Sequence, residues 1–225
     1  MDFKFKTNLQ AIIFDFDGVI NDSGKPGLER IIQIVRDAGH NIPDGVERTL
    51  RHEWGTHGTK LIEVCFGLNP GTSQELYKEW ERIDATQFFP LVADAKKTLA
   101  VLKDEMNLKI GILTSRNRQN LLDVVNHYGL LKLFDAIQCH DDYAFVKPDP
   151  RSFDYILNLL NIPKNACLYV GDTVGDLQAA TGANIRFVGV ETGFLQRSNW
   201  QAAGLESKNI LRDIGWLSAW ILKHF

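Results

Sequence analysis

Short apolar segments alternate with amphipathic segments along most of the chain. The apolar runs are rich in Ile, Val, Leu and Phe, and their length and composition predict buried strands. We expect these strands at residues 10–16, 108–113, 134–139, 166–170 and 185–190. Apolar positions at spacings of three and four predict amphipathic helices between most of them, at residues 93–105, 118–128 and 151–160. This alternation predicts an α/β fold with a doubly wound parallel sheet.

The interval between the first two strands is too long for a single crossover helix. From about residue 22 to Pro90, Gly and Pro residues punctuate a pattern that is helical and contains no convincing strand. Helices are expected there at residues 26–39, 43–53, 57–66 and 72–86. We therefore predict an α-helical cap domain at residues 22–90, inserted into a catalytic core formed by residues 1–21 and 91–225.

Composition and charge narrow the classes of function. The formal net charge is −3 over 225 residues and no Lys/Arg cluster is visible, so we expect no nucleic-acid partner. No apolar run approaches the roughly 18 residues needed to span a bilayer, and residues 1–7 lack the apolar segment of a signal peptide. We therefore expect a cytoplasmic protein that has no membrane partner.

Two further sets of residues are predicted to lie in the core. Cys65, Cys139 and Cys167 include no Cys-x-x-Cys pair, which favours reduced core residues over a disulfide or a zinc site. A final helix is expected near the C-terminus, and its Trp216 and Trp220 are expected to be buried.

The first strand ends in two carboxylates, Asp15 and Asp17, and then in Gly18. A buried strand tolerates charge poorly unless the charge is paired or bound to a cation. The two carboxylates therefore indicate a metal ligand, a nucleophile or both. A surface strand that ends in an Asp-Gly turn is the alternative, and this segment alone does not decide between the two.

Polar side chains also follow the second predicted strand, where Thr114 and Ser115 precede Arg116 and Asn117. Hydroxyl groups and free backbone N–H groups at a strand-to-helix junction suit a phosphate oxygen, and the dipole of the next helix adds to this preference. Taken alone, however, this segment is explained more simply as a helix cap.

Charged residues follow the third and fourth predicted strands. Lys147 precedes Pro148 and Pro150, which limit where its ammonium can lie; it would then neutralise a phosphate or a carboxylate, although most lysines are simply solvated. Asp172 and Asp176 are four residues apart, which predicts that both lie on one side of the first turn of a helix. Carboxylate oxygens with little sulfur or imidazole nearby favour Mg²⁺. Helix capping by Asp172 is the alternative, and it leaves Asp176 unexplained.

All four motifs come directly after predicted strands. Ligands bind beyond the carboxyl ends of the strands in an open parallel sheet. One shared site therefore accounts for the four motifs better than four separate coincidences do.

With these motifs the chain resembles the haloacid dehalogenase (HAD) superfamily of phosphohydrolases, in the phosphoglycolate phosphatase and β-phosphoglucomutase-like group with a helical (type C1) cap. The resemblance covers nearly the whole chain and implies a Rossmann-like core. The matching residues are Asp15, Asp17, Gly18, Thr114, Lys147, Gly171, Asp172 and Asp176. The presence of Asp17 argues against the dehalogenating branch, which lacks this carboxylate and does not use Mg²⁺. Val19 replaces the threonine that is common after this glycine, and phosphomutases and some phosphatases of the family are similar to this chain at that position.

The resemblance implies a Mg²⁺-dependent phosphatase that acts on a small phosphorylated metabolite through an aspartyl-phosphate. Asp15 would be the nucleophile, and Asp17 the general acid and base. The phosphate-binding residues it implies are Gly18, Thr114, Ser115 and Lys147. The metal-binding residues it implies are Asp15, Asp17 through its backbone carbonyl, Asp172, and Asp176 either directly or through water.

The cap is expected to select the substrate, a phosphoglycolate-like molecule or a sugar phosphate. The segment Arg51–Leu61 resembles the glycine-containing loop that closes over the site in phosphoglycolate phosphatase-like members. Within it Trp54, His57 and Lys60 are candidates for contacts with the leaving group, and a plain helical corner with solvated His and Lys is the alternative.

Other reactions remain open. A β-phosphoglucomutase-like mutase is the main rival, and a phosphonatase that uses a cap lysine, Lys60 or Lys25, ranks lower, as does a pyrophosphatase. A binding module without turnover finds no support, because the core motif positions carry competent residues. The protein is expected to be a monomer or a homodimer, since the apolar cap face at residues 64–86 suits either a subunit contact or packing within the cap.

Overall fold

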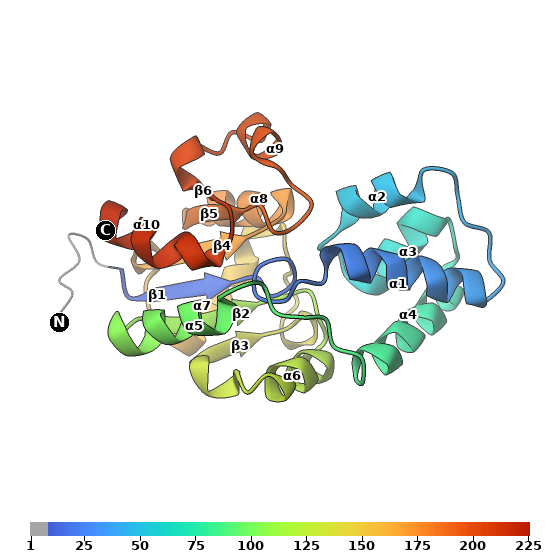
Figure 1. Cartoon of the computed structure of the whole chain (residues 1–225), viewed down its shortest axis with the longest axis horizontal. Helices are drawn as coiled ribbons and strands as arrows, with labels where there is room; N and C mark the ends of the chain where they lie inside the picture. The colour runs from blue at the N-terminus through green and yellow to red at the C-terminus, as the bar shows by residue number, and fades with distance from the viewer. Residues whose placement is uncertain (1–8) are drawn as a thin grey trace.

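The computed structural model describes residues 9–225, and its centre is a six-stranded parallel sheet in the order β3-β2-β1-β4-β5-β6 (Figure 1). The strands are β1 (Ala11–Phe14), β2 (Lys109–Leu113), β3 (Ala136–Gln138), β4 (Cys167–Gly171), β5 (Arg186–Val190) and β6 (Ile210–Leu211). The first five confirm the predicted strands and the α/β class. The edge strand β6 was not predicted, because two residues are too few to show a hydrophobic period.

The register of the sheet aligns the strand ends that carry the motifs. Strand β1 is central, and its Phe14 pairs with Ile112 of β2 and with Val170 of β4. The residues that follow these three strands therefore emerge at one edge of the sheet. This edge is the carboxyl edge at which open α/β sheets bind ligands.

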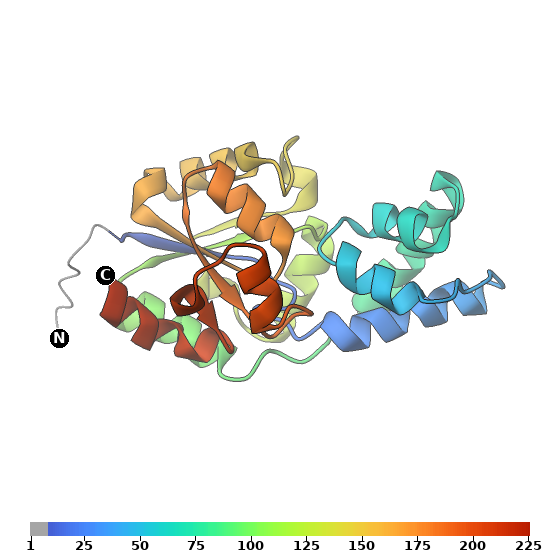
Figure 2. The same cartoon turned by 90° about the horizontal axis from the view of Figure 1, so that it is seen from above.

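Helices cover both faces of the sheet (Figure 2). Alternate residues of β1 supply the two cores: Ile12 and Phe14 pack against α5, α6 and α10, while Ala11 and Ile13 pack on the side of α7, α8 and α9. These helices are α5 (Ala95–Ala100), α6 (Arg118–His127), α7 (Phe153–Leu160), α8 (Val174–Gly182), α9 (Arg197–Ala202) and α10 (Leu217–His224). A π-helical turn, Val101–Glu105, continues α5 to the end of the predicted helix.

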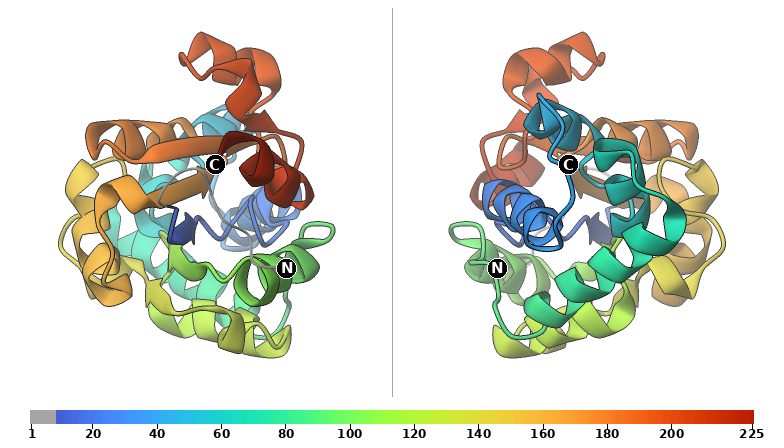
Figure 3. Two further views of the ribbon diagram at one scale, coloured as in Figure 1. Left: turned by 90° about the vertical axis from the view of Figure 1, so that its left-hand side faces the viewer. Right: turned by 90° about the vertical axis from the view of Figure 1, so that its right-hand side faces the viewer.

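Four further helices form the predicted cap beyond the carboxyl edge of the sheet (Figures 1 and 3). They are α1 (Gly24–Asp37), α2 (Val46–Glu53), α3 (Gly58–Phe66) and α4 (Pro70–Asp84). Helix α4 begins two residues before the predicted start, because the side chain of Asn69 accepts a hydrogen bond from the Thr72 N–H and Pro70 occupies the first helical position. The cap has a hydrophobic core of its own, in which Phe66 and Leu76 are buried.

Two chain segments side by side connect the cap to the core. The Asp22 N–H donates to the Pro90 carbonyl at 2.8 Å, and the Val92 N–H donates to the Ile20 carbonyl at 2.9 Å. The predicted boundaries, 21/22 and 90/91, fall in this paired region, and the division into two domains there remains a prediction. Residues 1–8 of the predicted core lie outside the described residues.

The predictions about individual core residues had mixed outcomes. All three cysteines are free and buried, as expected. Trp220 is buried, but Trp216 is 57% exposed, so its predicted burial was wrong. The physical reason is that Trp216 lies in a 3₁₀ turn before α10 and not on the apolar stripe of that helix. Among residues 9–225, no helix is long and apolar enough to span a membrane.

Candidate active site

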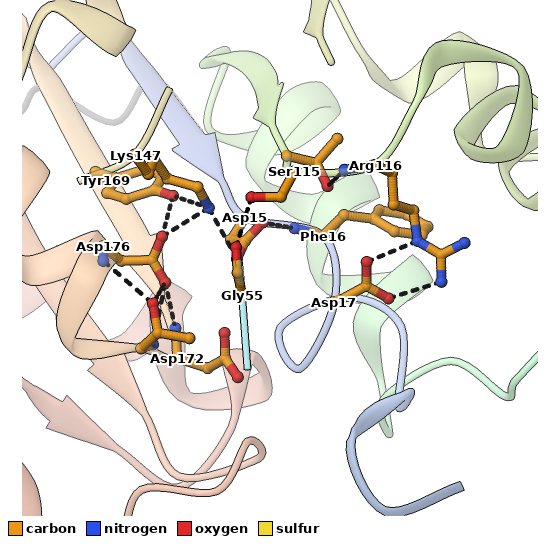
Figure 4. Close-up of polar contacts among 12 residues, drawn as sticks. Asp15, Phe16, Asp17, Gly55, Ser115, Arg116, Lys147, Tyr169, Asp172 and Asp176 are labelled. Atoms are coloured by element: carbon orange, nitrogen blue, oxygen red, sulfur yellow. Dashed lines mark hydrogen bonds and ion pairs between the residues drawn. The ribbon is translucent and has the colours of Figure 1, made fainter. Parts of the chain in front are cut away.

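Three strand ends and one loop bring polar and charged residues together at the carboxyl edge of the sheet (Figure 4). Asp15 follows β1, Thr114 follows β2 and Asp172 follows β4. Lys147 comes from the loop between β3 and α7. The convergence that the order of motifs predicts is therefore present in the structure.

A buried lysine connects two of the carboxylates. Lys147 Nζ lies 3.0 Å from Asp15 Oδ2 and 2.7 Å from Asp176 Oδ1. It also donates to Tyr169 Oη at 3.1 Å. Burial alone would lower the pKa of Lys147, but the charges of Asp15 and Asp176 outweigh this effect and raise the pKa above its ordinary value. The lysine is therefore held as a cation beside Asp15.

Asp176 uses both of its oxygens in hydrogen bonds. One oxygen accepts from Lys147 and from the Tyr169 hydroxyl at 2.7 Å each. The other accepts from the Asp172 and Thr173 N–H groups and from the Thr173 hydroxyl. Thr173 and Asp176 form the capping box of α8, so Thr173, and not Asp172, caps this helix. Asp176 therefore orients Lys147 and the loop after β4.

Asp172 has the opposite character. The residue is 2% exposed, and neither carboxylate oxygen has a hydrogen-bond partner among residues 9–225. Burial and the charges of Asp15 and Asp176 raise its pKa well above the ordinary value. A Cβ atom at Gly18 or at Gly193 would lie about 2 Å from an Asp172 oxygen, so both glycines make room for this carboxylate. Such an uncompensated buried carboxylate calls for a cation.

The donor set fits a hard divalent cation. Oxygens of Asp15, Asp172 and Asp176 all lie within 4.8 Å of one another. Burial raises the pKa of Asp15 to about 7; Asp176 and Asp17 add to this shift, while Lys147 opposes it. Carboxylate oxygens are the ligands that Mg²⁺ prefers. Each Asp176 oxygen already has two or three partners, whereas each Asp15 oxygen has one, the Phe16 N–H or Lys147. Asp15 and Asp172 therefore have more capacity than Asp176 to coordinate an ion.

Asp17 points away from this cluster and towards Arg116 (Figure 4). Arg116 Nε and Nη2 donate to the two Asp17 oxygens at 2.6 and 2.8 Å. The third nitrogen of the guanidinium, Nη1, donates to buried Asp84 at the end of cap helix α4. Burial would raise the pKa of Asp17, but the charge and hydrogen bonds of Arg116 outweigh it and lower that pKa. Asp17 is therefore held as a carboxylate.

The predicted phosphate-binding groups already have partners in this structure. Thr114 is buried, and its oxygen accepts from the Arg116 N–H at 3.2 Å. The Ser115 hydroxyl donates to the carbonyl of cap residue Gly55 at 2.7 Å. The Gly18 N–H donates to the Asn21 carbonyl at 2.8 Å. Ser115 and Gly18 would have to exchange these partners to donate to a phosphate.

The three predicted cap residues lie at two adjoining spaces that share some lining residues. An inner pocket of about 90 Å³ lies between cap and core, and Asp15, Asp17 and Trp54 are among its lining residues. An outer cleft of about 630 Å³ is lined by Trp54, His57 and Lys60 among others. The His57 ring stacks on His140 of the core at 3.9 Å, while Lys60 Nζ pairs with Glu63 and its side chain is 63% exposed. Only Trp54 of the three lines the inner pocket.

The sequence reasoning missed four residues of the polar network, Arg116, Asp84, Arg30 and Tyr169. Arg116 stands within the second motif, but its main partner in the cap, Asp84, lies 32 residues away in sequence. Arg30 of α1 also pairs with Asp84, at 3.0 Å. The fourth, Tyr169, resembles one more apolar residue in the pattern of β4. A polar group inside a buried strand was the available signal for it, since such a group needs a hydrogen-bond partner.

A doubly wound core, a helical cap and a cluster of carboxylates with one lysine at the carboxyl edge define a class of hydrolase. A family model described as haloacid dehalogenase-like hydrolase matches residues 12–190, and the chain belongs to this family.

Relatives extend this result. The chain is 30% identical over 204 residues to a phosphoglycolate phosphatase of Synechococcus elongatus, covering 87% of this chain and 90% of that protein. A hydrolase structure from Pseudomonas syringae has a TM-score of 0.79 and 23% identity, covering 94% of this chain and 97% of that one. A structure from Thermotoga maritima, a candidate β-phosphoglucomutase, has a TM-score of 0.74 and 19% identity, covering 96% and 100%. The family and its relatives identify the chain as a phosphatase of the HAD type.

Proposed function

We propose that this chain is a Mg²⁺-dependent phosphatase that hydrolyses a small phosphomonoester through an aspartyl-phosphate on Asp15. The observation that carries the proposal is the pair of Asp15 and Asp172 at the sheet edge. One of these carboxylates touches Lys147 at 3.0 Å, and the other is buried without a partner. A carboxylate that attacks an anionic phosphate needs positive charge nearby, which Lys147 supplies and a cation at Asp172 would increase.

The reaction divides into two displacements. An Asp15 oxygen attacks phosphorus and forms the acyl phosphate, while the ester bond breaks and the leaving oxygen takes a proton from Asp17. Water then attacks the same phosphorus and gives a proton to Asp17, so that Asp15 and inorganic phosphate are released. Asp17 lines the inner pocket with Asp15, which suits both steps. Because Arg116 holds Asp17 as a carboxylate, Asp17 must first leave Arg116 and take up a proton from solvent, which it then gives to the leaving oxygen.

The phosphoryl group would be bound by Lys147 and Thr114, with Ser115 and Gly18 as further donors. Mg²⁺ would be held by Asp15, Asp172 and the backbone carbonyl of Asp17. A bound Mg²⁺ neutralises charge on the phosphoryl oxygens and reduces their repulsion with the nucleophile. Asp176 would act indirectly, by orienting Lys147 and the loop that carries Asp172.

The substrate would be a small phosphorylated metabolite in the cytoplasm, either phosphoglycolate-like or a sugar phosphate. The phosphoglycolate phosphatase relative supports the first of these. Trp54, together with His57 and Lys60 at the outer cleft, remains the predicted contact region for the substrate. The protein would act as a monomer or as a homodimer.

Release of inorganic phosphate from a panel of phosphomonoesters, sugar phosphates and pyrophosphate tests the proposal. We expect release with Mg²⁺ and none after treatment with EDTA. Isomerisation of a sugar phosphate without net release, stimulated by a sugar bisphosphate, would assign the mutase reaction instead. Release from pyrophosphate alone would assign a pyrophosphatase, and no turnover of any ester would overturn the proposal.

A further inference from the structure

The cap lines the inner pocket with apolar and aromatic side chains. They come from three cap helices and from the loop between α2 and α3, and they are Ile31, Trp54, Leu61, Tyr77 and Trp80. Asp15 and Asp17 line this pocket and do not line the outer cleft. A leaving group in reach of both carboxylates therefore lies against these five cap side chains, which we call the aromatic wall.

Two glycines in the cap allow the aromatic rings to stand where they do. A Cβ atom on Gly27 of α1 would lie 2.8 Å from the Trp54 ring and 3.2 Å from the Trp80 ring. A Cβ atom on Gly58, the first residue of α3, would lie 2.0 Å from the Tyr77 ring. Glycine weakens a helix relative to alanine, and here it permits the close packing of helix and ring. The rings are thus fixed by the backbone beside them.

Within residues 9–225, no unpaired cation lines the inner pocket to bind a second anionic group. Arg116 is the one cation among the described residues that line the pocket, and all three of its nitrogens bind Asp17 or Asp84. Arg30, which shares Asp84, donates its other Nη to the Gln87 carbonyl at 2.7 Å. An anionic group in the pocket would meet these carboxylates without an unpaired cation to bind. Burial of an unpaired charge is strongly unfavourable.

We infer that the inner pocket selects a leaving group that is uncharged and presents an apolar face, such as an alkyl or aryl group or one side of a sugar ring. The aromatic rings supply contact area for such a face, and the absence of a free cation disfavours a compact carboxylate such as glycolate. This inference rests on the proposed function, and it chooses the uncharged class over phosphoglycolate.

Paired substrates test the inference. The value of kcat/KM is compared for phosphoglycolate and for 2-hydroxyethyl phosphate, which has a similar size without the carboxylate, and then for benzyl phosphate. We expect the two uncharged leaving groups to be preferred by about tenfold or more. Phosphoglycolate as the preferred member of the set would overturn the inference while leaving the phosphatase intact. Absence of turnover for every ester would instead overturn the proposed function, and the inference with it.

A variant in the aromatic wall provides the second readout. Trp80→Ala should lower kcat/KM for benzyl phosphate by about fivefold to tenfold and change the value for phosphoglycolate by less than about twofold. Trp216→Ala, at a tryptophan that is 57% exposed and remote from the pocket, is the matched control and should change neither value. Equal loss for both substrates in Trp80→Ala would show a purely structural role of the ring and contradict the inference.

Discussion

The surroundings of one residue, Asp172, indicate that the site binds a cation. A buried carboxylate without hydrogen bonds destabilises the metal-free fold, and a bound cation removes that penalty. The sequence predicted its position after β4 but not its isolation, because isolation depends on Gly18 and Gly193, which are remote in sequence. The same limit applies to Asp176, whose partner Tyr169 looks apolar in the pattern of β4.

Removal of the Asp172 charge should separate stability from function. Asp172→Asn should increase the free energy of unfolding of the metal-free protein at pH 8 by about 1 kcal/mol, because no buried charge remains there. It should also abolish the rise in Tm on addition of Mg²⁺ and reduce turnover at least about 100-fold. Urea unfolding and thermal scans measure these effects. The control is Asp154→Asn, which changes a partly exposed aspartate that pairs with Lys164. A normal Mg²⁺-induced rise in Tm would exclude Asp172 as a ligand.

The raised pKa of Asp15 predicts a pH dependence. Its pKa rises from 3.8 to about 7 on folding, so between these values the folded state retains a proton that the unfolded state has lost. The stability of the metal-free protein should therefore fall as the pH rises from about 4 to above 7. Mg²⁺ binds the ionised carboxylates, so the increase in Tm that it causes should grow over the same range. Thermal scans with and without Mg²⁺ would contradict this account if the increase were larger at pH 5 than at pH 8.

At the scale of elements, a chain of ion pairs joins the end of β2 to the cap. Arg116 bridges Asp17 and Asp84, and Arg30 of α1 binds the other side of Asp84. The Arg30 guanidinium also lies 3.8 Å from the centre of the Phe89 ring, in the segment that leads from α4 back to the core. This network connects Asp17, the candidate general acid, to α1 at the start of the cap and to the end of α4 at its close. The sequence predicted the strands and helices because their periods are local, whereas these ion pairs follow from tertiary packing.

Substitution of Arg116 should be far more costly than substitution of a neighbouring arginine. Arg116→Gln leaves Asp17 without its cation and leaves buried Asp84 with Arg30 alone, so it should lower the free energy of unfolding by about 3 kcal/mol or more. Arg118→Gln, which breaks the partly exposed pair with Asp142, should cost about 1 kcal/mol or less. Urea unfolding of both variants measures the difference. Similar losses in the two variants would show that the network contributes no more than a surface ion pair.

At the scale of the whole molecule, cap and core touch directly above the candidate site. The Ser115 hydroxyl binds the Gly55 carbonyl, and the His57 ring stacks on His140. Burial lowers the pKa of both histidines, so the neutral rings are favoured in this closed arrangement. The sequence predicted a cap with a closing loop at residues 51–61, but which core groups hold that loop depends on how the cap docks.

Loss of the Ser115 hydroxyl should loosen this closure. One hydrogen bond of this kind contributes about 1 kcal/mol, so Ser115→Ala should speed amide exchange in residues 54–57 by about twofold to tenfold. Ser198→Ala, at an exposed position of α9, is the control and should leave that exchange unchanged. Hydrogen exchange followed by mass spectrometry measures both variants. Unchanged exchange in Ser115→Ala would show that the other contacts alone hold the cap.

The identity of the phosphorylated residue tests the central claim most directly. The enzyme is mixed with Mg²⁺ and its best phosphomonoester, quenched in acid during turnover and reduced with borohydride, which converts an aspartyl-phosphate to homoserine. Peptide mass spectrometry should find homoserine at position 15, and none in Asp15→Asn, whose turnover should fall by more than about 1000-fold. Homoserine at another aspartate, or full turnover by Asp15→Asn, would contradict the account.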